Sequence, residues 1–209
     1  MLLFRFLYLI HTMKNKIILS LFPVALLSVA GCASNAHYVE TGGRESVVNV
    51  GQINIQDYIQ AANDSAKELL ASGALTRVSN PPAVVAISRI INNTGQQIDT
   101  DLLVKKIRVA ILNSGQAVTS TTIGVGGKAE DQLAKGMQQQ NEFMNDQQNT
   151  RLPDFTLSGK IIQLTASSGS TRQSTYSFQL SLTDTKTGNA VWEGEKEITK
   201  QGSRSTVGF

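Results

Sequence analysis

The chain contains a single cysteine, Cys32, which follows an apolar stretch at residues 17–30. Lys14 and Lys16 stand just before that stretch. A basic start, an apolar run of roughly 7–15 residues and small residues at its end are typical of an export signal, whereas a transmembrane helix needs about 20 apolar residues. With one cysteine no disulfide can form within the chain, so whatever follows the signal must fold on a hydrophobic core of its own.

The four residues 29–32 read Val-Ala-Gly-Cys and resemble the lipobox of bacterial lipoproteins. The resemblance implies that the thiol of Cys32 is acylated and that Cys32 becomes the first residue of the mature chain. An ordinary secretory signal with a free thiol nearby is the alternative. We expect lipidation, because the sequence offers neither a second cysteine nor a histidine cluster that could use the thiol. Several acyl chains on one residue are enough for stable anchoring in a membrane.

A second methionine, Met13, opens a signal that is complete without residues 1–12. We expect translation to start there; the alternative is a start at Met1, with a longer basic segment that includes Arg5. Ala33, not aspartate, follows the cysteine. In enterobacterial lipoproteins, which the lipobox resembles, this residue implies sorting to the outer membrane, with the protein on its periplasmic side.

The basic character of the chain comes from the signal. The chain has 19 lysines and arginines and 16 acidic residues, and Arg5, Lys14 and Lys16 precede Cys32 while no acidic residue does. The part from Cys32 onward therefore carries 16 residues of each sign. A neutral domain gives no indication of nucleic-acid binding.

These observations predict three regions. Residues 1–31 form the signal peptide, residues 32–52 the lipidated cysteine and a polar tether without helical or strand periodicity, and residues 53–209 a periplasmic domain. At some 150 residues such a domain buries close to 70% of its unfolded surface, so it needs neither disulfide nor metal.

The first half of the domain shows helical and buried-strand patterns. Apolar residues three and four apart predict a helix over residues 55–70, ended by Gly73. Residues 83–91 are apolar and β-branched without alternation, which predicts a strand buried on both faces. A second helix is capped by Thr100 or Asp99 and ends at Gly115. Its predicted inner face consists of Leu103, Val104, Ile107, Ala110 and Ile111.

A weaker strand over residues 117–122 follows, and strand, helix and strand in this order suggest a right-handed parallel crossover. A third helix is predicted over residues 128–147, with Met137, Phe143 and Met144 as its apolar anchors and a solvated outer face.

The last third predicts three strands joined by short loops, at residues 155–167, 175–182 and 190–200. The second has the clearest alternation, because Tyr176, Phe178, Leu180 and Leu182 share one side. We therefore expect an α+β fold with one mixed sheet, a parallel βαβ crossover, a C-terminal antiparallel meander and helices packed on the sheet.

Catalytic and metal-binding signatures are not met. The glycine-rich residues 124–128 lack the Ser/Thr that a phosphate-binding loop needs after its lysine. His37 is the one histidine after the signal, so triads and His-ligated metal sites are not expected. Glu193, Glu195 and Glu197 alternate on one strand; they suggest a charged edge that resists strand pairing, with carboxylates for glycoside chemistry as the alternative. We expect no enzyme, no catalytic residue, no cofactor and no metal.

Two stretches resemble the LpoB family of outer-membrane lipoproteins over roughly residues 80–202. They are AVVAISRIINNTGQQIDTDLLVKKIRVAILNSGQ and YSFQLSLTDTKTGNAVWEGEKEITKQG. The resembling features are the strand that ends in Asn93-Thr94, the helix that ends in Asn113-Ser114-Gly115, and Thr187-Gly188 leading to Trp192.

The resemblance implies a catalytically inert domain related to the TolB N-terminal fold. The domain would bind a bifunctional penicillin-binding protein, a peptidoglycan synthase, and stimulate glycan polymerisation and cross-linking. Well-known members carry a long Pro-rich tether, whereas residues 33–80 contain no proline here. The alternative is therefore a structural or assembly lipoprotein of a secretion or flagellar outer-membrane apparatus.

Overall fold

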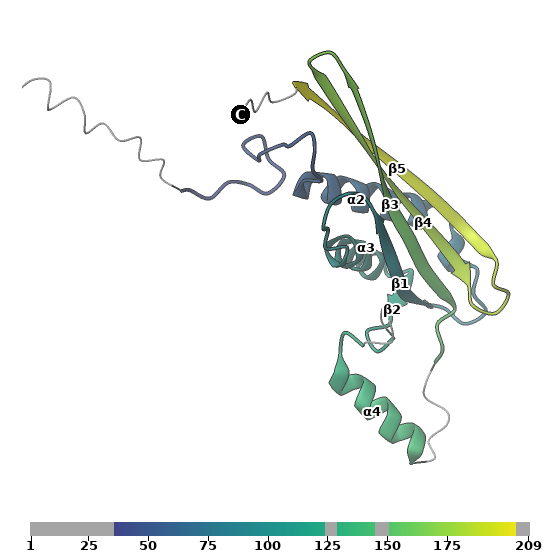
Figure 1. Cartoon of the computed structure of the whole chain (residues 1–209). Coiled ribbons are helices and arrows are strands. Elements are labelled where there is room, and N and C mark those ends of the chain that lie inside the picture. The colour runs from purple at the N-terminus through teal and green to yellow at the C-terminus, as the bar shows by residue number, and fades with distance from the viewer. Residues whose placement is uncertain (1–35, 124–128, 145–150, 204–209) are drawn as a thin grey trace, which may run out of the picture. The chain divides into compact units, whose positions relative to one another are not determined.

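A computed structural model describes residues 36–123, 129–144 and 151–203. Its centre is one five-stranded sheet in the order β2-β1-β3-β4-β5 (Figure 1). The strands are β1 (Ala83–Asn93), β2 (Ala117–Thr119), β3 (Phe155–Ser168), β4 (Thr171–Asp184) and β5 (Ala190–Ser203). The helices are α2 (Ile55–Ala71), α3 (Asp101–Ser114) and α4 (Gln132–Phe143), with a 3-10 turn, η2, at Ala74–Thr76.

The sheet is mixed. β1 pairs in parallel with β2 on one side and with β3 on the other, and β3, β4 and β5 follow as an antiparallel meander. The expected crossover is β1–α3–β2. The predicted α+β fold, with its mixed sheet, parallel crossover and C-terminal meander, is confirmed.

The core lies between the sheet and the two helices α2 and α3, which Figure 1 shows on the same side of the strands. The alternation predicted for β4 places its apolar side chains there, where Tyr176 and Leu182 are fully buried. From the helices, Leu69 of α2 and Ile107 of α3 complete this layer. Gly73 and Gly115 adopt the left-handed conformation just past the two helices, as predicted for helix ends.

The opposite face of the sheet is covered by no helix of the described residues. The prediction that residues 83–91 are buried on both faces is therefore wrong for their second half. Arg89 is exposed, and half of Ile91 is accessible to solvent. The continuous apolar run reflects a change of environment along one strand, buried at its start and open at its end.

Helix α4 also differs from the prediction. It runs over Gln132–Phe143, and residues 128 and 145–147 of the predicted helix lie outside the described part. Met137, Phe143 and Met144 are 58%, 89% and 72% exposed, so their predicted role as anchors is wrong. Asp131 caps the helix by accepting a 2.9 Å hydrogen bond from the amide of Ala134. This local cap, and not burial, supports α4.

Candidate docking surface

The open face of the sheet presents polar side chains in register across three strands. Residues paired between neighbouring strands point to the same side of a sheet. The pairs Lys160–Gln179 and Gln179–Glu195 therefore place one side chain from each of β3, β4 and β5 in a row. Parallel rows are formed by Ser158–Ser181–Glu193 and by Ile162–Ser177–Glu197.

A β-bulge lies at the β1 side of this face. Ile87 pairs with Leu157 and Ile90 with Gly159, so Ser88 and Arg89 together face one residue of β3. A bulge re-aims the side chains at its position. Ser88 and Arg89 line a shallow depression of about 650 Å³ that extends over Lys160 to Glu193 and Glu195.

Charge is divided across the open face. The basic residues, Arg89 and Lys160, come from β1 and β3, whereas Glu193, Glu195 and Glu197 form an acidic row on the edge strand β5. The hydroxyl of Ser177 and the amide of Gln179 donate hydrogen bonds of 2.5 and 2.7 Å to the Glu195 carboxylate. These bonds, with a smaller effect of the positive charge of Lys160, lower the pKa of Glu195. The carboxylate is therefore ionised at neutral pH.

Apolar side chains complete the surface. Ile91 of β1 and Leu164 of β3 are 50% and 62% exposed, and the half-buried Ile162 lies on the same face of β3, two residues from Leu164 and two from Lys160, the partner of Ile91. The face thus combines an apolar group with basic residues on one side and acidic residues on the other. Such a combination suits the binding of another protein surface. Among the described residues no group of acidic, histidine or cysteine side chains is placed to hold a metal ion.

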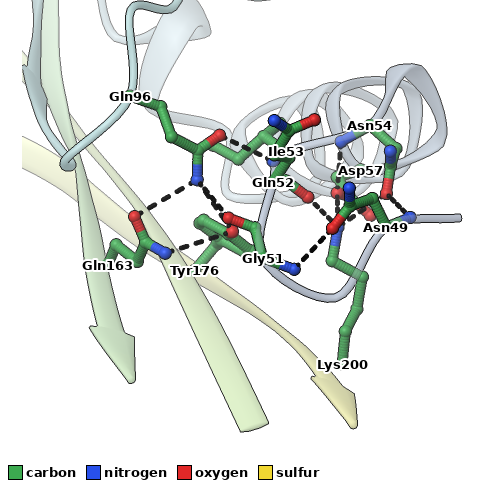
Figure 2. Close-up of polar contacts among 10 residues, drawn as sticks. All are labelled: Asn49, Gly51, Gln52, Ile53, Asn54, Asp57, Gln96, Gln163, Tyr176 and Lys200. Atoms are coloured by element: carbon green, nitrogen blue, oxygen red, sulfur yellow. Dashed lines mark hydrogen bonds and ion pairs between the residues drawn. The ribbon is translucent and has the colours of Figure 1, made fainter. Parts of the chain in front are cut away.

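A second polar cluster lies at the end of the sheet near the N-terminus of α2 (Figure 2). Its centre is Lys200 of β5, whose ammonium lies 2.6 Å from the Asp57 carboxylate, with both side chains about nine-tenths buried. The ammonium also lies 5.0 Å from the centre of the Tyr176 ring. The side-chain amide of Gln96 donates a 2.9 Å hydrogen bond to the hydroxyl of the same tyrosine. This cluster connects α2, the loop after β1 and the meander.

The residues singled out in the sequence have different positions. Cys32 and the glycine-rich residues 124–128 lie outside the described part, so lipidation of Cys32 stays a prediction. His37 is exposed in the described part, and Asp99 accepts a hydrogen bond from the amide of Asp101 at the start of α3.

Glu193, Glu195 and Glu197 lie together on the open face of an edge strand. Sequence reasoning missed the pairing of Asp57 with Lys200, 143 residues away. Asn54 followed three residues later by Asp57 is a capping pattern that the sequence shows, and in the structure Asp57 accepts a 2.7 Å hydrogen bond from the amide of Asn54. No sequence pattern indicated Lys200 as the partner of Asp57.

Comparison with protein-family models identifies a class of regulatory activators to which the chain is similar. The family model described as peptidoglycan-synthase activator LpoB matches residues 57–198, from the first turn of α2 to β5. The chain belongs to the LpoB family, as the resemblance implied.

Solved structures with a similar fold include two LpoB C-terminal domains. That from Salmonella enterica is 16% identical, with a TM-score of 0.42, and that from Escherichia coli is 12% identical, with a TM-score of 0.41. Each comparison covers 68% of this chain and 98% of the other. The lipoprotein GNA1162 from Neisseria meningitidis is 15% identical with a TM-score of 0.35, covering 59% of this chain and 88% of that one. No curated protein matches the chain. In the described part no helix is long and apolar enough to cross a membrane.

Proposed function

We propose that this chain is an outer-membrane lipoprotein that binds a bifunctional penicillin-binding protein and stimulates its synthesis of peptidoglycan. The observation that carries the proposal is the family match, which spans the sheet from β1 into β5 and places the domain among peptidoglycan-synthase activators. The domain acts as a regulator of the synthase, without catalytic chemistry of its own.

The open face of the sheet supplies the contact with the synthase. Helices α2 and α3 occupy the other side, whereas no helix of the described residues covers this face, which carries an apolar group between opposite charges. Charges arranged in this way set orientation and association rate, and the apolar centre contributes most of the affinity. The partner surface therefore presents acidic groups toward Arg89 and Lys160 and basic groups toward the β5 row.

The test uses the full chain, purified in detergent, as bait in a pull-down from solubilised envelope, followed by a glycan-polymerisation assay with the synthase recovered. Lys160→Glu should weaken binding and stimulation by about tenfold or more. Lys67→Glu, an equal charge change on the exposed side of α2, is the matched control and should leave both unchanged. Stimulation that survives Lys160→Glu and Ile91→Asp alike would exclude this face, and no stimulation by the wild-type chain of any recovered synthase would refute the function.

The membrane anchor of this function is the acylated thiol of Cys32. Cys32→Ser should remain unprocessed or be released, because serine cannot form the thioether that the lipobox motif implies. Metabolic labelling with a palmitate analogue measures this directly. Label incorporated equally into the serine variant would disprove the anchor while leaving the docking surface open.

A structural or assembly lipoprotein of the outer membrane is the second candidate function. It is favoured by the point at which the folded unit begins, residue 40, because only seven residues, 33–39, then separate that unit from Cys32. A domain held this close to its anchor suits assembly at the membrane. Sedimentation of the purified chain discriminates the two functions, since an assembly protein should form a defined oligomer at micromolar concentration.

A further inference from the structure

The segment before α2 is bound to the domain through its own backbone. Side chains from distant parts of the chain form hydrogen bonds with its amide and carbonyl groups (Figure 2). Gln96 donates a 2.9 Å hydrogen bond to the carbonyl of Gly51 and accepts one of 3.0 Å from the amide of Ile53. From the other side, the ammonium of Lys200 donates to the carbonyl of Gln52 and, over 2.8 Å, to the side chain of Asn54.

Further hydrogen bonds stabilise the turn that this segment makes. The amide of Asn49 donates to the Asn54 side chain over 3.0 Å, and the amide of Gly51 donates to the Asn49 side chain over 2.8 Å. Backbone groups of residues 49–53 thus find fixed partners, where a free tether would leave them to water. Three of these partners, Gln96, Lys200 and Asn54, come from a loop, a strand and a helix cap.

Side-chain packing supports the same arrangement. Val50 lies directly over Gly202 of β5, where an added Cβ would meet its Cγ2 at 2.7 Å. Upstream, Gly42 lies against the side chain of Ile59 on α2, at ordinary contact distance for a Cβ. The hydroxyl of Ser46 stabilises the turn at residues 40–46: it accepts a 3.0 Å hydrogen bond from the amide of Gly42 and donates one to the carbonyl of Glu40.

We infer that residues 40–54 form a strap that belongs to the folded domain and is fastened by Gln96, Lys200 and Gly202. The strap sets the reach of the domain. With the strap closed, seven residues connect Cys32 to Glu40 and span about 27 Å at full extension. With the strap open as far as Asn54, the same connection spans about 75 Å.

Two states of one segment therefore give two working distances from the membrane anchor. In the closed state the docking surface meets only partners that extend close to the anchor. In the open state it meets partners much farther away, because a partner beyond the limit of a tether has an effective concentration near zero. This inference rests on the proposed Cys32 anchor for its consequence, but the strap itself is a property of the domain and is tested without a partner or a membrane.

Hydrogen–deuterium exchange of the full chain in detergent tests the strap. The amides of Asn49, Gly51 and Ile53 should exchange at least about tenfold more slowly than the same amides in an unfolded chain. Gly202→Val should remove this protection, because its side chain would occupy the place of Val50. Amides of the core strand β4 should keep theirs. Gln201→Val, the exposed neighbour on the other side of the same strand, is the matched control and should leave the strap protected.

The outcomes separate the strap from the proposed function. Unprotected amides at residues 49–53 in the wild-type chain would overturn the inference, whatever the chain does to a synthase. If protection persists in Gly202→Val, Gln96→Ala is the second variant, because it removes the hydrogen bonds to Gly51 and Ile53. Protection that survives both variants would show that the named contacts do not hold the strap, and it would also overturn the inference. Loss of protection in Gly202→Val alone, with the core intact, supports it even if no synthase responds.

Discussion

The ammonium of Lys200 on the last strand lies 2.6 Å from the carboxylate of Asp57 in the first turn of α2, and both side chains are about nine-tenths buried. A second ion pair between the same two elements, Lys196 with Asp64 at 2.9 Å, is more than one-third exposed. The two pairs have similar geometry and sequence positions but different solvent access. They therefore form a matched test of what burial does to an ion pair.

Lys200→Met should lower the free energy of unfolding by about 3–5 kcal/mol, because it leaves the Asp57 carboxylate buried without its partner. Lys196→Met should change it by about 0–1 kcal/mol, since water and salt screen the exposed pair. Urea unfolding of both variants measures the difference. Equal effects in the two variants would show that the Asp57 site is solvated in solution.

Tyr58 carries a buried hydroxyl that has no hydrogen-bond partner among the described residues. Tyr58→Phe should therefore raise the free energy of unfolding by about 1 kcal/mol, because it removes an unsatisfied polar group and keeps the edge-to-face contact with Phe178. Tyr176→Phe is the contrasting variant. It should cost about 1–2 kcal/mol, since Gln96 and Gln163 would lose their bonds to the Tyr176 hydroxyl. Denaturant midpoints of the two variants should move in opposite directions.

The buried hydroxyl of Tyr58 also makes us expect the stability of the domain to depend on pH in the alkaline range. Burial, followed by the negative charges of Asp99 and Asp57, raises the pKa of Tyr58 from 10.0 to about 12. A phenol whose pKa is higher in the folded state adds no pH dependence below pH 10, where both states keep the proton. Stability then falls as the pH rises from 10 toward 12, because only the unfolded chain has released the proton. Tyr58→Phe should flatten stability in that range. A tyrosine absorbance titration complete by pH 11 in the folded wild-type chain would contradict the raised pKa.

Trp192 lies near the start of β5 with its indole ring over Gly194, where an added Cβ would meet the ring at 2.4 Å. The side chain is 9% exposed and belongs to the core. Trp192→Ala should therefore destabilise the domain by about 3–5 kcal/mol. Leu164→Ala, a truncation of a 62% exposed side chain on the open face, should stay within about 0.5 kcal/mol. A Trp192→Ala midpoint equal to that of the wild type would place the indole in solvent and make it a binding anchor.

Sequence patterns predicted what is local in this fold. The helix ends at Gly73 and Gly115 and the alternation of β4 depend on residues within a few positions of one another. The same patterns could not show that β1 also pairs in parallel with β3, because that contact brings together residues some 70 positions apart. The apolar run of β1 was interpreted as buried on both faces because it shows no alternation.

The candidate site was harder to predict for the same reason. Glu193, Glu195 and Glu197 were recognised as one strand face, but their partners Ser177, Gln179 and Ser181 depend on the register of the meander. Lys160 and Arg89 were not singled out, because only the β1–β3 pairing and its bulge bring them to this face. The segment before α2 looked like tether throughout, since its contacts are made by its backbone and not by a recognisable pattern of side chains.

The strap gives a final prediction about reach in the cell. Inserting twenty Gly/Ser residues after Val39 lengthens the connection to Cys32 without touching the strap. If the chain activates a synthase far from its anchor, the insertion should preserve or increase wall synthesis, because it raises the effective concentration of the docking surface at the partner. Gly202→Val should act in the same direction by opening the strap. Combining it with the insertion should add little, since the reach is then already sufficient. Incorporation of labelled peptidoglycan precursors in a strain that carries only the variant chain measures this.

If the chain instead builds an assembly at the outer membrane, both changes should impair that assembly, because they loosen the position of the domain. Impaired wall synthesis in both variants, with normal protein levels and anchoring, would contradict the activator function.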